Sequence, residues 1–181
     1  DIGVSVLAKS SANIHSCKIW DNGTGVYLMN SPATIHASSI RYSDGNGIEI
    51  DAARDSLGIQ ADIDGCVIAN NGSNGMLLAE KAAPEIHNCS IFSNGENPGG
   101  GYAIRLIAYS REDSIRAEEN FWGVGNNTGP KIAALIFDRW DAPGSIMGYV
   151  SFTPWLDVSP GLAATGDKRG ARERAWERLL Q

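Results

Sequence analysis

The sequence lacks three features that would indicate particular classes of protein. No stretch approaches the ~20 consecutive apolar residues of a membrane-spanning helix, so we expect no membrane insertion. Three cysteines in 181 residues are too few for a disulfide framework. Lys and Arg number 15 against 21 Asp and Glu, which gives a formal net charge of -6. Because nucleic-acid binding needs clustered basic residues, this balance argues against a nucleic-acid partner.

Glycine is abundant instead, with 21 residues, and it accompanies a phrase that recurs along the chain. The phrase reads IHSCKIWDNGTG from Ile14, IHASSIRYSDGNG from Ile35, IDGCVIANNGSNG from Ile63 and IHNCSIFSNGENPGG from Ile86. A glycine opens each apolar stretch between these phrases, with spacings of 22, 22, 28 and 26 residues: Gly3, Gly25, Gly47, Gly75 and Gly101. A period of roughly 20 to 30 residues indicates a solenoid.

Each repeat has the pattern of short β-strands. The density of Gly and Asn excludes helical repeats, and the L-x-x-L-x-L pattern of leucine-rich repeats is missing. GVSVL from Gly3 and GVYLM from Gly25 alternate between inward and outward positions, and ANIHSCKI from Ala12 forms a second strand of its coil. Asn-Gly and Asp-Gly pairs turn the corners, because Asn, Asp and Gly tolerate a left-handed backbone. The sequence therefore predicts an all-β fold, a parallel β-helix of about five coils.

The coils resemble those of the right-handed parallel β-helix proteins, the pectate-lyase-like superfamily. The segment NFWG…IFDRWD…GYVSFTPWL, from Asn120 to Leu156, resembles the N-x-W-G…D-x-x-D…P-W-L closing segment of secreted and cell-surface members. The resemblance implies a right-handed solenoid at an extracellular or cell-surface location, with the periplasm as an alternative. It says little about activity, because this fold hosts lyases, hydrolases, esterases, epimerases and adhesins.

We expect three segments: β-helix coils over 1–123, a closing segment over 124–158, and a linker with a short amphipathic helical tail over 159–181. Trp122, Trp140 and Trp155 are expected to close the end of the coil stack. The chain enters its first strand at DIGVSV without a cap, and an open sheet end exposes unpaired backbone groups. Further coils, another domain or self-association at this N-terminal end would cover it.

Two isoleucine columns are expected to form the core: Ile14, Ile35, Ile63, Ile86 and Ile115, and then Ile19, Ile40, Ile68 and Ile91, with Asn120 in the fifth coil. Between them, a column of small residues is expected to line a corner facing inward: Cys17, Ser38, Cys66 and Cys89, with Glu118 in the fifth coil. A disulfide between Cys66 and Cys89 in adjacent coils is left open. Thiolate binding of a metal is not expected without Cys-x-x-Cys spacing.

All three histidines follow an inward isoleucine and should therefore point outward. They form one column with an acid and a base: His15, His36, Asp64, His87 and Arg116. Side chains stacked at the strand spacing of ~5 Å could share Cu or Zn. The alternative is a polar outer face on which like residues stack because the repeat was duplicated.

The other outer face belongs to the glycine-led strands. Its first outward column is expected to hold Ser5, Tyr27, Glu49, Leu77 and Ala103, and its second Leu7, Met29, Asp51, Ala79 and Arg105. Tyr27, Met29 and Leu77 are apolar where solvent is expected, which makes them candidate ligand-binding residues. Glu49 and Asp51 are candidate catalytic carboxylates, because paired carboxylates suit acid–base work on sugars. The basic candidates beside them are Arg41, Lys81 and Arg105.

Three functions stay open. The first is a non-catalytic surface or extracellular module of a larger protein, with a structural, adhesive or glycan-binding role. It is favoured because the sequence contains no recognisable polygalacturonase or lyase motif. The second is a polysaccharide-active enzyme, a lyase, hydrolase or epimerase, and the third is metal handling by the histidine column. The expected partner is a polysaccharide. No cofactor is expected, with Ca²⁺ or a transition metal as the alternative, and Asp138 and Asp141 are interpreted as structural or as Ca²⁺ ligands.

Overall fold

A computed structural model describes residues 1–52, 60–95, 98 and 100–160. Residues 53–59, 96–97, 99 and 161–181 lie outside the described residues, and with them nearly all of the linker and helical tail expected over 159–181. Within the described part of the chain, no helix has the length and apolar character needed to cross a bilayer.

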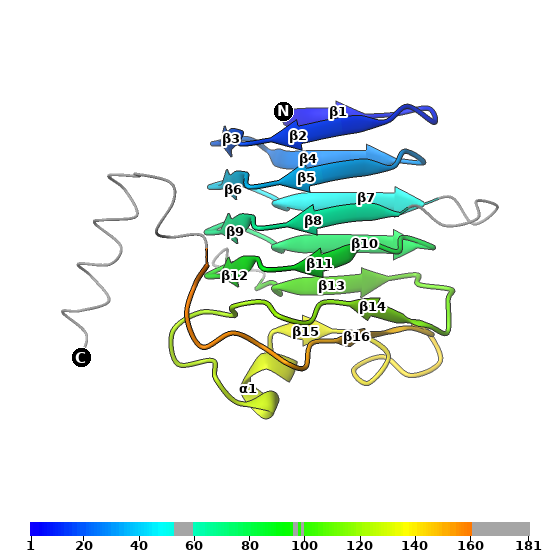
Figure 1. Ribbon diagram of the computed structural model, residues 1–181. Coiled ribbons are helices and arrows are strands. Elements are labelled where there is room, and N and C mark those ends of the chain that lie inside the picture. The colour runs from blue at the N-terminus through cyan, green and yellow to red at the C-terminus, as the bar shows by residue number, and fades with distance from the viewer. Residues whose placement is uncertain (53–59, 96–97, 99, 161–181) are drawn as a thin grey trace.

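The strands form three sheets in which successive coils stack in parallel (Figure 1). Sheet A contains β1 (Ile2–Val6), β4 (Thr24–Met29), β7 (Ile48–Ala52), β10 (Met76–Glu80), β13 (Ile104–Ile107) and β15 (Ile136–Phe137). Sheet B contains β2 (Ala12–His15), β5 (Ala33–His36), β8 (Ala61–Asp64), β11 (Glu85–His87), β14 (Ser114–Arg116) and β16 (Tyr149–Ser151). Sheet C contains β3 (Lys18–Trp20), β6 (Ser39–Arg41), β9 (Val67–Ala69) and β12 (Ser90–Phe92). The fold is a right-handed parallel β-helix, as predicted.

Each regular coil has three strands rather than the two expected. The stretch expected to be one strand is divided between sheets B and C by a residue with positive φ: Ser16 at 55°, Ala37 at 48° and Asn88 at 52°. A left-handed residue breaks an extended backbone and turns it through a corner. The expected corner at the column of small residues therefore divides this stretch into two strands, where a single strand was predicted.

The predicted isoleucine columns form two sides of the core, and buried residues of sheet A such as Leu28, Ile50 and Leu78 form the third. Ile14, Ile35, Ile63 and Ile86 lie in register across sheet B, and all are buried. Ile19, Ile40, Ile68 and Ile91 do the same across sheet C. Each fully buried isoleucine contributes about 1.5–3 kcal/mol relative to an exposed one. Stacking of like side chains from coil to coil therefore stabilises the solenoid along its axis.

Polar ladders join the coils where the backbone turns. The thiols of Cys66 and Cys89 donate to the carbonyl oxygens of Ile35 and Ile63 in the preceding coil. Both are free thiols, so the disulfide left open above is not formed, and Cys17 in the first coil is exposed rather than inward.

At the second corner, Asn71 Oδ1 accepts the N–H of Ser43, and Asn94 Oδ1 accepts the N–H of Asn71. Side chains thereby satisfy backbone groups that the sheets cannot pair.

Glycine opens these coils because the backbone packs closely against the next coil. A Cβ atom on Gly25 would lie 2.5 Å from the carbonyl oxygen of Gly47. One on Gly47 would lie 2.7 Å from Asn71 Nδ2. A residue with a Cβ atom at these positions would clash with the next coil or with the asparagine ladder, so both positions require glycine.

The fifth coil is shifted relative to the predicted alignment. Arg116 pairs with Glu85, so it does not follow His87 in the histidine column. Asn120 takes the corner place expected for Glu118: its Oδ1 accepts the N–H of Cys89 at 2.8 Å. A bridge between Ser90 and Phe121 then places Trp122 beside Ile91. In sheet A the register of β10 and β13 puts Ala103, rather than Gly101, opposite Gly75.

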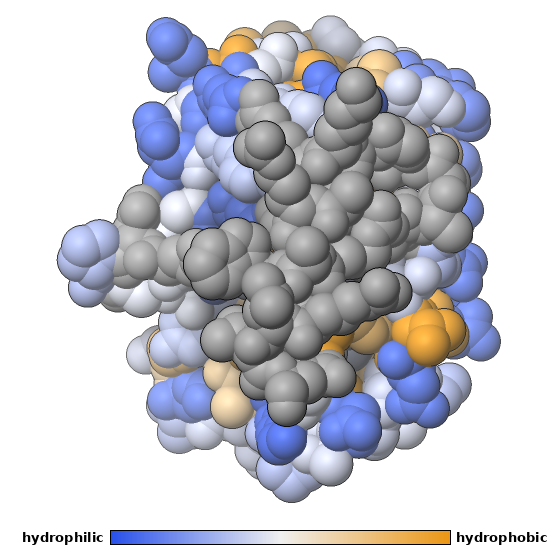
Figure 2. Space-filling view, turned by 90° about the vertical axis from the view of Figure 1, so that its left-hand side faces the viewer, coloured by the Kyte–Doolittle hydropathy of each residue, from blue (hydrophilic) through white to orange (hydrophobic). Residues whose placement is uncertain are grey.

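The closing segment covers the last coil with α1 (Gly129–Ala133), β15 and β16. Ile132 from α1 is buried, and Trp122 is only 1% exposed, which agrees with its predicted closing role. Trp155 packs partly buried against the core, but Trp140 is 74% exposed and closes nothing. The prediction for Trp140 was wrong. At the opposite end, Ile2 and Leu7 are exposed, and Figure 2 shows apolar atoms along that rim.

Candidate functional site

The outer face of sheet A carries most of the residues predicted for catalysis and binding. The pairing register places Tyr27 beside Glu49, Glu49 beside Leu77, and Leu77 beside Arg105. Arg105 therefore lies in the first outward column, where Ala103 was expected. Ala103 is buried, so its outward assignment was wrong. Met29 and Asp51 lie side by side in the second column.

The charged groups on this face do not converge. Leu77 separates Glu49 from Arg105, which puts their strands about 10 Å apart. Asn46 Nδ2 donates to Glu49 Oε2 at 3.0 Å, and the Arg105 guanidinium packs over the ring of Phe137 at 5.3 Å. The pKa of Tyr27 is raised, mainly by partial burial and to a lesser extent by the negative charges of Asp51 and Glu49. Glu49 and Arg105 are thus each engaged with a different neighbour, and among the described residues no contact joins the two.

Two basic candidates lie elsewhere. Arg41 belongs to β6 in sheet C and is 1% exposed, so it does not share the face of Glu49 and Asp51. Lys81 lies in the turn after β10, where its backbone N–H donates to the carbonyl oxygen of Ala52. Arg41 is therefore not grouped with the carboxylates of sheet A, contrary to the prediction.

The outer face of sheet B brings the histidines together around a different acid. His15, His36, Asp64 and His87 are in register as predicted. However, the side chains of His36 and His87 contact Asp62: their Nε2 atoms lie 3.0 Å and 3.4 Å from its two carboxylate oxygens. Asp64 instead accepts a hydrogen bond from Asn88 Nδ2.

Asp62 is the residue that sequence reasoning missed. It precedes Asp64 by two positions and so shares its outward face, which is a signal that strand alternation provides. Among the residues that the structure describes, no group of three or more His, Cys, Asp or Glu side chains has the geometry to hold a metal ion. Metal handling therefore stays a prediction, and a contact between His and Asp side chains is what the geometry provides here.

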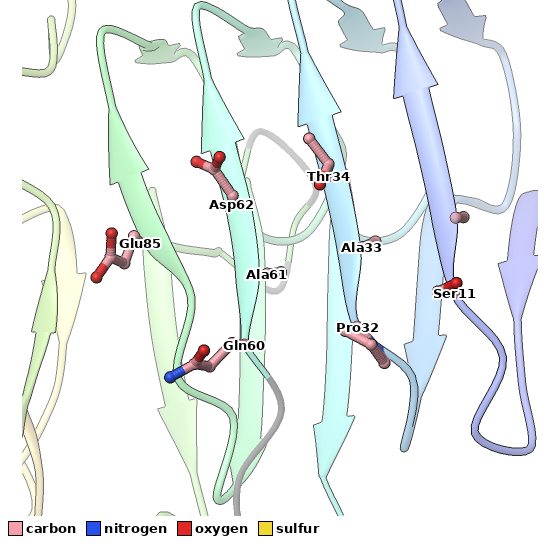
Figure 3. A pocket seen from close by; sticks show the side chains of 9 residues that line it. Ser11, Pro32, Ala33, Thr34, Gln60, Ala61, Asp62 and Glu85 are labelled. Carbon is pink, nitrogen blue, oxygen red and sulfur yellow. The ribbon is translucent and has the colours of Figure 1, made fainter.

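A shallow groove of about 400 Å³ crosses the starts of the sheet B strands beside this cluster. Its polar lining combines hydroxyl groups, an amide and two carboxylates, and its floor is alanine and proline (Figure 3). The lining residues are Ser11, Ala12, Pro32, Ala33, Thr34, Gln60, Ala61, Asp62 and Glu85.

Asp62 and Glu85 stand opposite each other on adjacent strands of the groove. Glu85 Oε1 also lies 3.3 Å from Arg116 Nη1. The guanidinium of Arg116 partly offsets the negative charge of Glu85, and the imidazoles of His36 and His87 contact the carboxylate of Asp62. The arrangement can accept and donate hydrogen bonds along a line that crosses four coils.

A family model described as a right-handed β-helix region matches residues 1–121. The chain belongs to this family. The match covers all the coils of the β-helix through the shifted fifth coil, and the closing segment lies beyond it. Searches of curated proteins and of solved structures found no match for this β-helix protein. Its function is therefore argued from the groove and the surfaces around it.

Proposed function

We propose that this β-helix is a non-catalytic, glycan-binding module of a surface or extracellular protein, and that it binds a saccharide chain in the sheet B groove. The observation that carries the proposal is the groove lining. Hydroxyl, amide and carboxylate groups from successive coils suit the many hydroxyl groups of a sugar polymer.

The direction of the groove supports an extended ligand. The lining comes from β2, β5, β8 and β11 and nearby turns, so a bound chain would run along the solenoid axis across the coils. Solenoids commonly use such continuous surfaces for binding. The groove is open, and the described residues of its lining include no Lys or Arg, so we expect neutral glycans to bind better than uronic-acid polymers.

The test compares two Glu→Gln variants that differ in position. Glu85→Gln in the groove is expected to weaken binding of a neutral polysaccharide about tenfold, because a hydrogen bond to a charged group contributes about 1.5–3 kcal/mol. Glu49→Gln on sheet A is the matched control and should bind like the wild type. Affinity electrophoresis against neutral and acidic polysaccharides measures the retardation. Equal loss in both variants, or unchanged binding in Glu85→Gln, would contradict the groove assignment.

One observation favours a second candidate, a glycoside hydrolase. Asp62 and Glu85 are paired on adjacent strands, and two neighbouring carboxyl groups are what retaining glycosidases use. Both carboxylates are already in contact with imidazole or guanidinium groups, which suits ligand binding better than proton donation. Product analysis of each retarded polysaccharide separates the two functions. Cleavage products that disappear in Asp62→Asn would establish the enzyme instead.

A further inference from the structure

Trp140 is exposed at the capped end although the other closing aromatics are packed. Its side chain is 74% exposed, whereas Trp122 is 1% exposed and stacks edge-on against Phe152. Exposing a large aromatic surface costs free energy, and such residues commonly mark binding sites. The feature lies at the far end of the molecule from the first coil and outside the lining of the sheet B groove.

The indole ring contacts a guanidinium group that also packs over a second aromatic ring. The guanidinium of Arg139 lies between two rings, 4.7 Å from the centroid of Trp140 and 4.5 Å from that of Tyr149. The backbone N–H of Trp140 donates to Asp138 Oδ1 at 2.9 Å, and Asp138 Oδ2 accepts the N–H of Val150 at 3.0 Å. Asp138 thereby ties the tryptophan to β16, and the cation–π contacts favour one ring orientation.

A cavity of about 290 Å³ opens beside this ring. Its apolar walls come from α1, β15, β16 and Phe152, and its only polar residues are Asp138 and Asp141. The residues that line it are Ala133, Ala134, Ile136, Asp138, Trp140, Asp141, Val150 and Phe152.

The two carboxylates of the cavity only accept hydrogen bonds. Both oxygens of Asp138 are used by backbone N–H groups, and Asp141 Oδ2 accepts the N–H of Asp138 at 3.1 Å. Asp141 Oδ1 has no hydrogen-bond donor among the described residues, so it is the acceptor left for a ligand. A matching ligand needs a flat apolar face for the indole and a hydroxyl group for Asp141. Two carboxylates disfavour an anionic ligand.

We infer that Trp140, Asp141 and the adjoining cavity form a binding site for one uncharged pyranose ring, separate from the sheet B groove. The ring stacks on the indole and donates a hydroxyl hydrogen bond to Asp141 Oδ1. The cavity is at the small end of the range of ligand sites, about 300–1,000 Å³, which fits a single ring rather than a longer segment.

The test titrates a neutral glucose hexasaccharide and a galacturonic acid hexasaccharide into the protein. Affinity is followed by calorimetry, and acrylamide quenching of tryptophan emission reports cover of the exposed ring. Variants are Trp140→Ala, Trp140→Phe and Asp141→Asn. The control is Leu7→Ala, which removes another exposed apolar side chain at the opposite end. Every variant is also made in an Asp62→Asn/Glu85→Gln background, in which the groove is disabled.

In the groove-disabled background, we expect Trp140→Ala to lose about tenfold or more in affinity for the neutral hexasaccharide. Trp140→Phe should retain part of the affinity, Asp141→Asn should weaken it, and Leu7→Ala should leave it unchanged. The neutral ligand should also protect wild-type emission from acrylamide, and the galacturonic acid hexasaccharide should not.

Unchanged affinity in Trp140→Ala, or no ligand-dependent protection from acrylamide, would overturn the inference while leaving the groove proposal standing. Binding that depends on Trp140 and persists in the groove-disabled background supports the inference. Residual binding in Trp140→Ala that is the same with and without the two groove substitutions would contradict the groove proposal. Absence of neutral-glycan binding in every variant and the wild type would overturn both.

Discussion

Substitution of Asn71 by alanine tests whether the asparagine ladder holds the coils together. Asn71 is fully buried, and its side chain makes three contacts with neighbouring coils. Oδ1 accepts the N–H of Ser43 at 3.1 Å, and Nδ2 donates to Ile40 O at 3.4 Å and to Asn94 Oδ1 at 2.9 Å. Alanine would leave the N–H of Ser43 without this acceptor.

The expected loss follows from these contacts. A buried donor left unsatisfied costs about 1–3 kcal/mol, and each of the other two hydrogen bonds contributes about 0.5–1.5 kcal/mol. We therefore expect Asn71→Ala to lower the free energy of unfolding by about 3 kcal/mol. For a chain of this size, that loss corresponds to a fall in Tm of about 6–12 °C.

The matched control is Asn88→Ala. Asn88 is exposed, and Ala37 already occupies the same left-handed corner of an earlier coil, with φ of 48° against 52°. We expect this change to cost less than about 1 kcal/mol. Equilibrium urea unfolding, followed by both circular dichroism and tryptophan emission, measures the difference and tests whether the coils unfold together. Equal losses in the two variants would refute the ladder argument.

Three further perturbations test the core, the coil spacing and the pH response. Ile68→Asp should unfold the domain, because it places an unpaired charge at a fully buried position; a folded variant by circular dichroism would contradict the inward assignment. Gly47→Ala should lower Tm, because the added Cβ atom would lie 2.7 Å from Asn71 Nδ2. Gly129→Ala should not, because a Cβ atom there has nothing within 4 Å. Equal shifts in Tm would show that the close approach at Gly47 is relieved at little cost. Burial raises the pKa of Tyr109, whose hydroxyl donates to Ala82 O at 2.7 Å, so the unfolded chain loses this proton first as pH rises. The stabilising effect of the Tyr109 hydroxyl on the folded state should thus be present below pH ~10 and lost above it. The difference in free energy of unfolding between wild type and Tyr109→Phe should shrink between pH 9 and 11. A difference that stays constant over this range would contradict the linkage.

The regular coils could be predicted because each repeat of the sequence forms one coil of the structure. An inward isoleucine every 21 to 28 residues, as at Ile14, Ile35 and Ile63, defines one stacked column, since parallel strands in register place like residues side by side. The asparagines and glycines of the turns predicted the positions of the corners, because they recur at the same place in each repeat.

The fifth coil could not be placed from the same pattern. The repeat pattern predicts that Ile115 lies opposite Ile86. Arg116 instead pairs with Glu85, so the next residue, Ala117, lies opposite Ile86. What fixes this register is Asn120, which caps the N–H of Cys89, and Trp122, which fills the place beside Ile91. Both are contacts between coils, and single-coil spacing does not reveal them.

The candidate sites divide in the same way. The sequence determined which residues face outward, including the histidines and Tyr27, because alternation along a strand is a local property. Only the tertiary structure decided their partners: Asp62 between His36 and His87, and Arg105 separated from Glu49 by Leu77. Exposure of Trp140 was likewise decided by how the closing segment folds back over the last coil. Partner choice and exposure depend on the lateral stacking of segments distant in the chain, and a repeat period does not encode that stacking once the repeat becomes irregular.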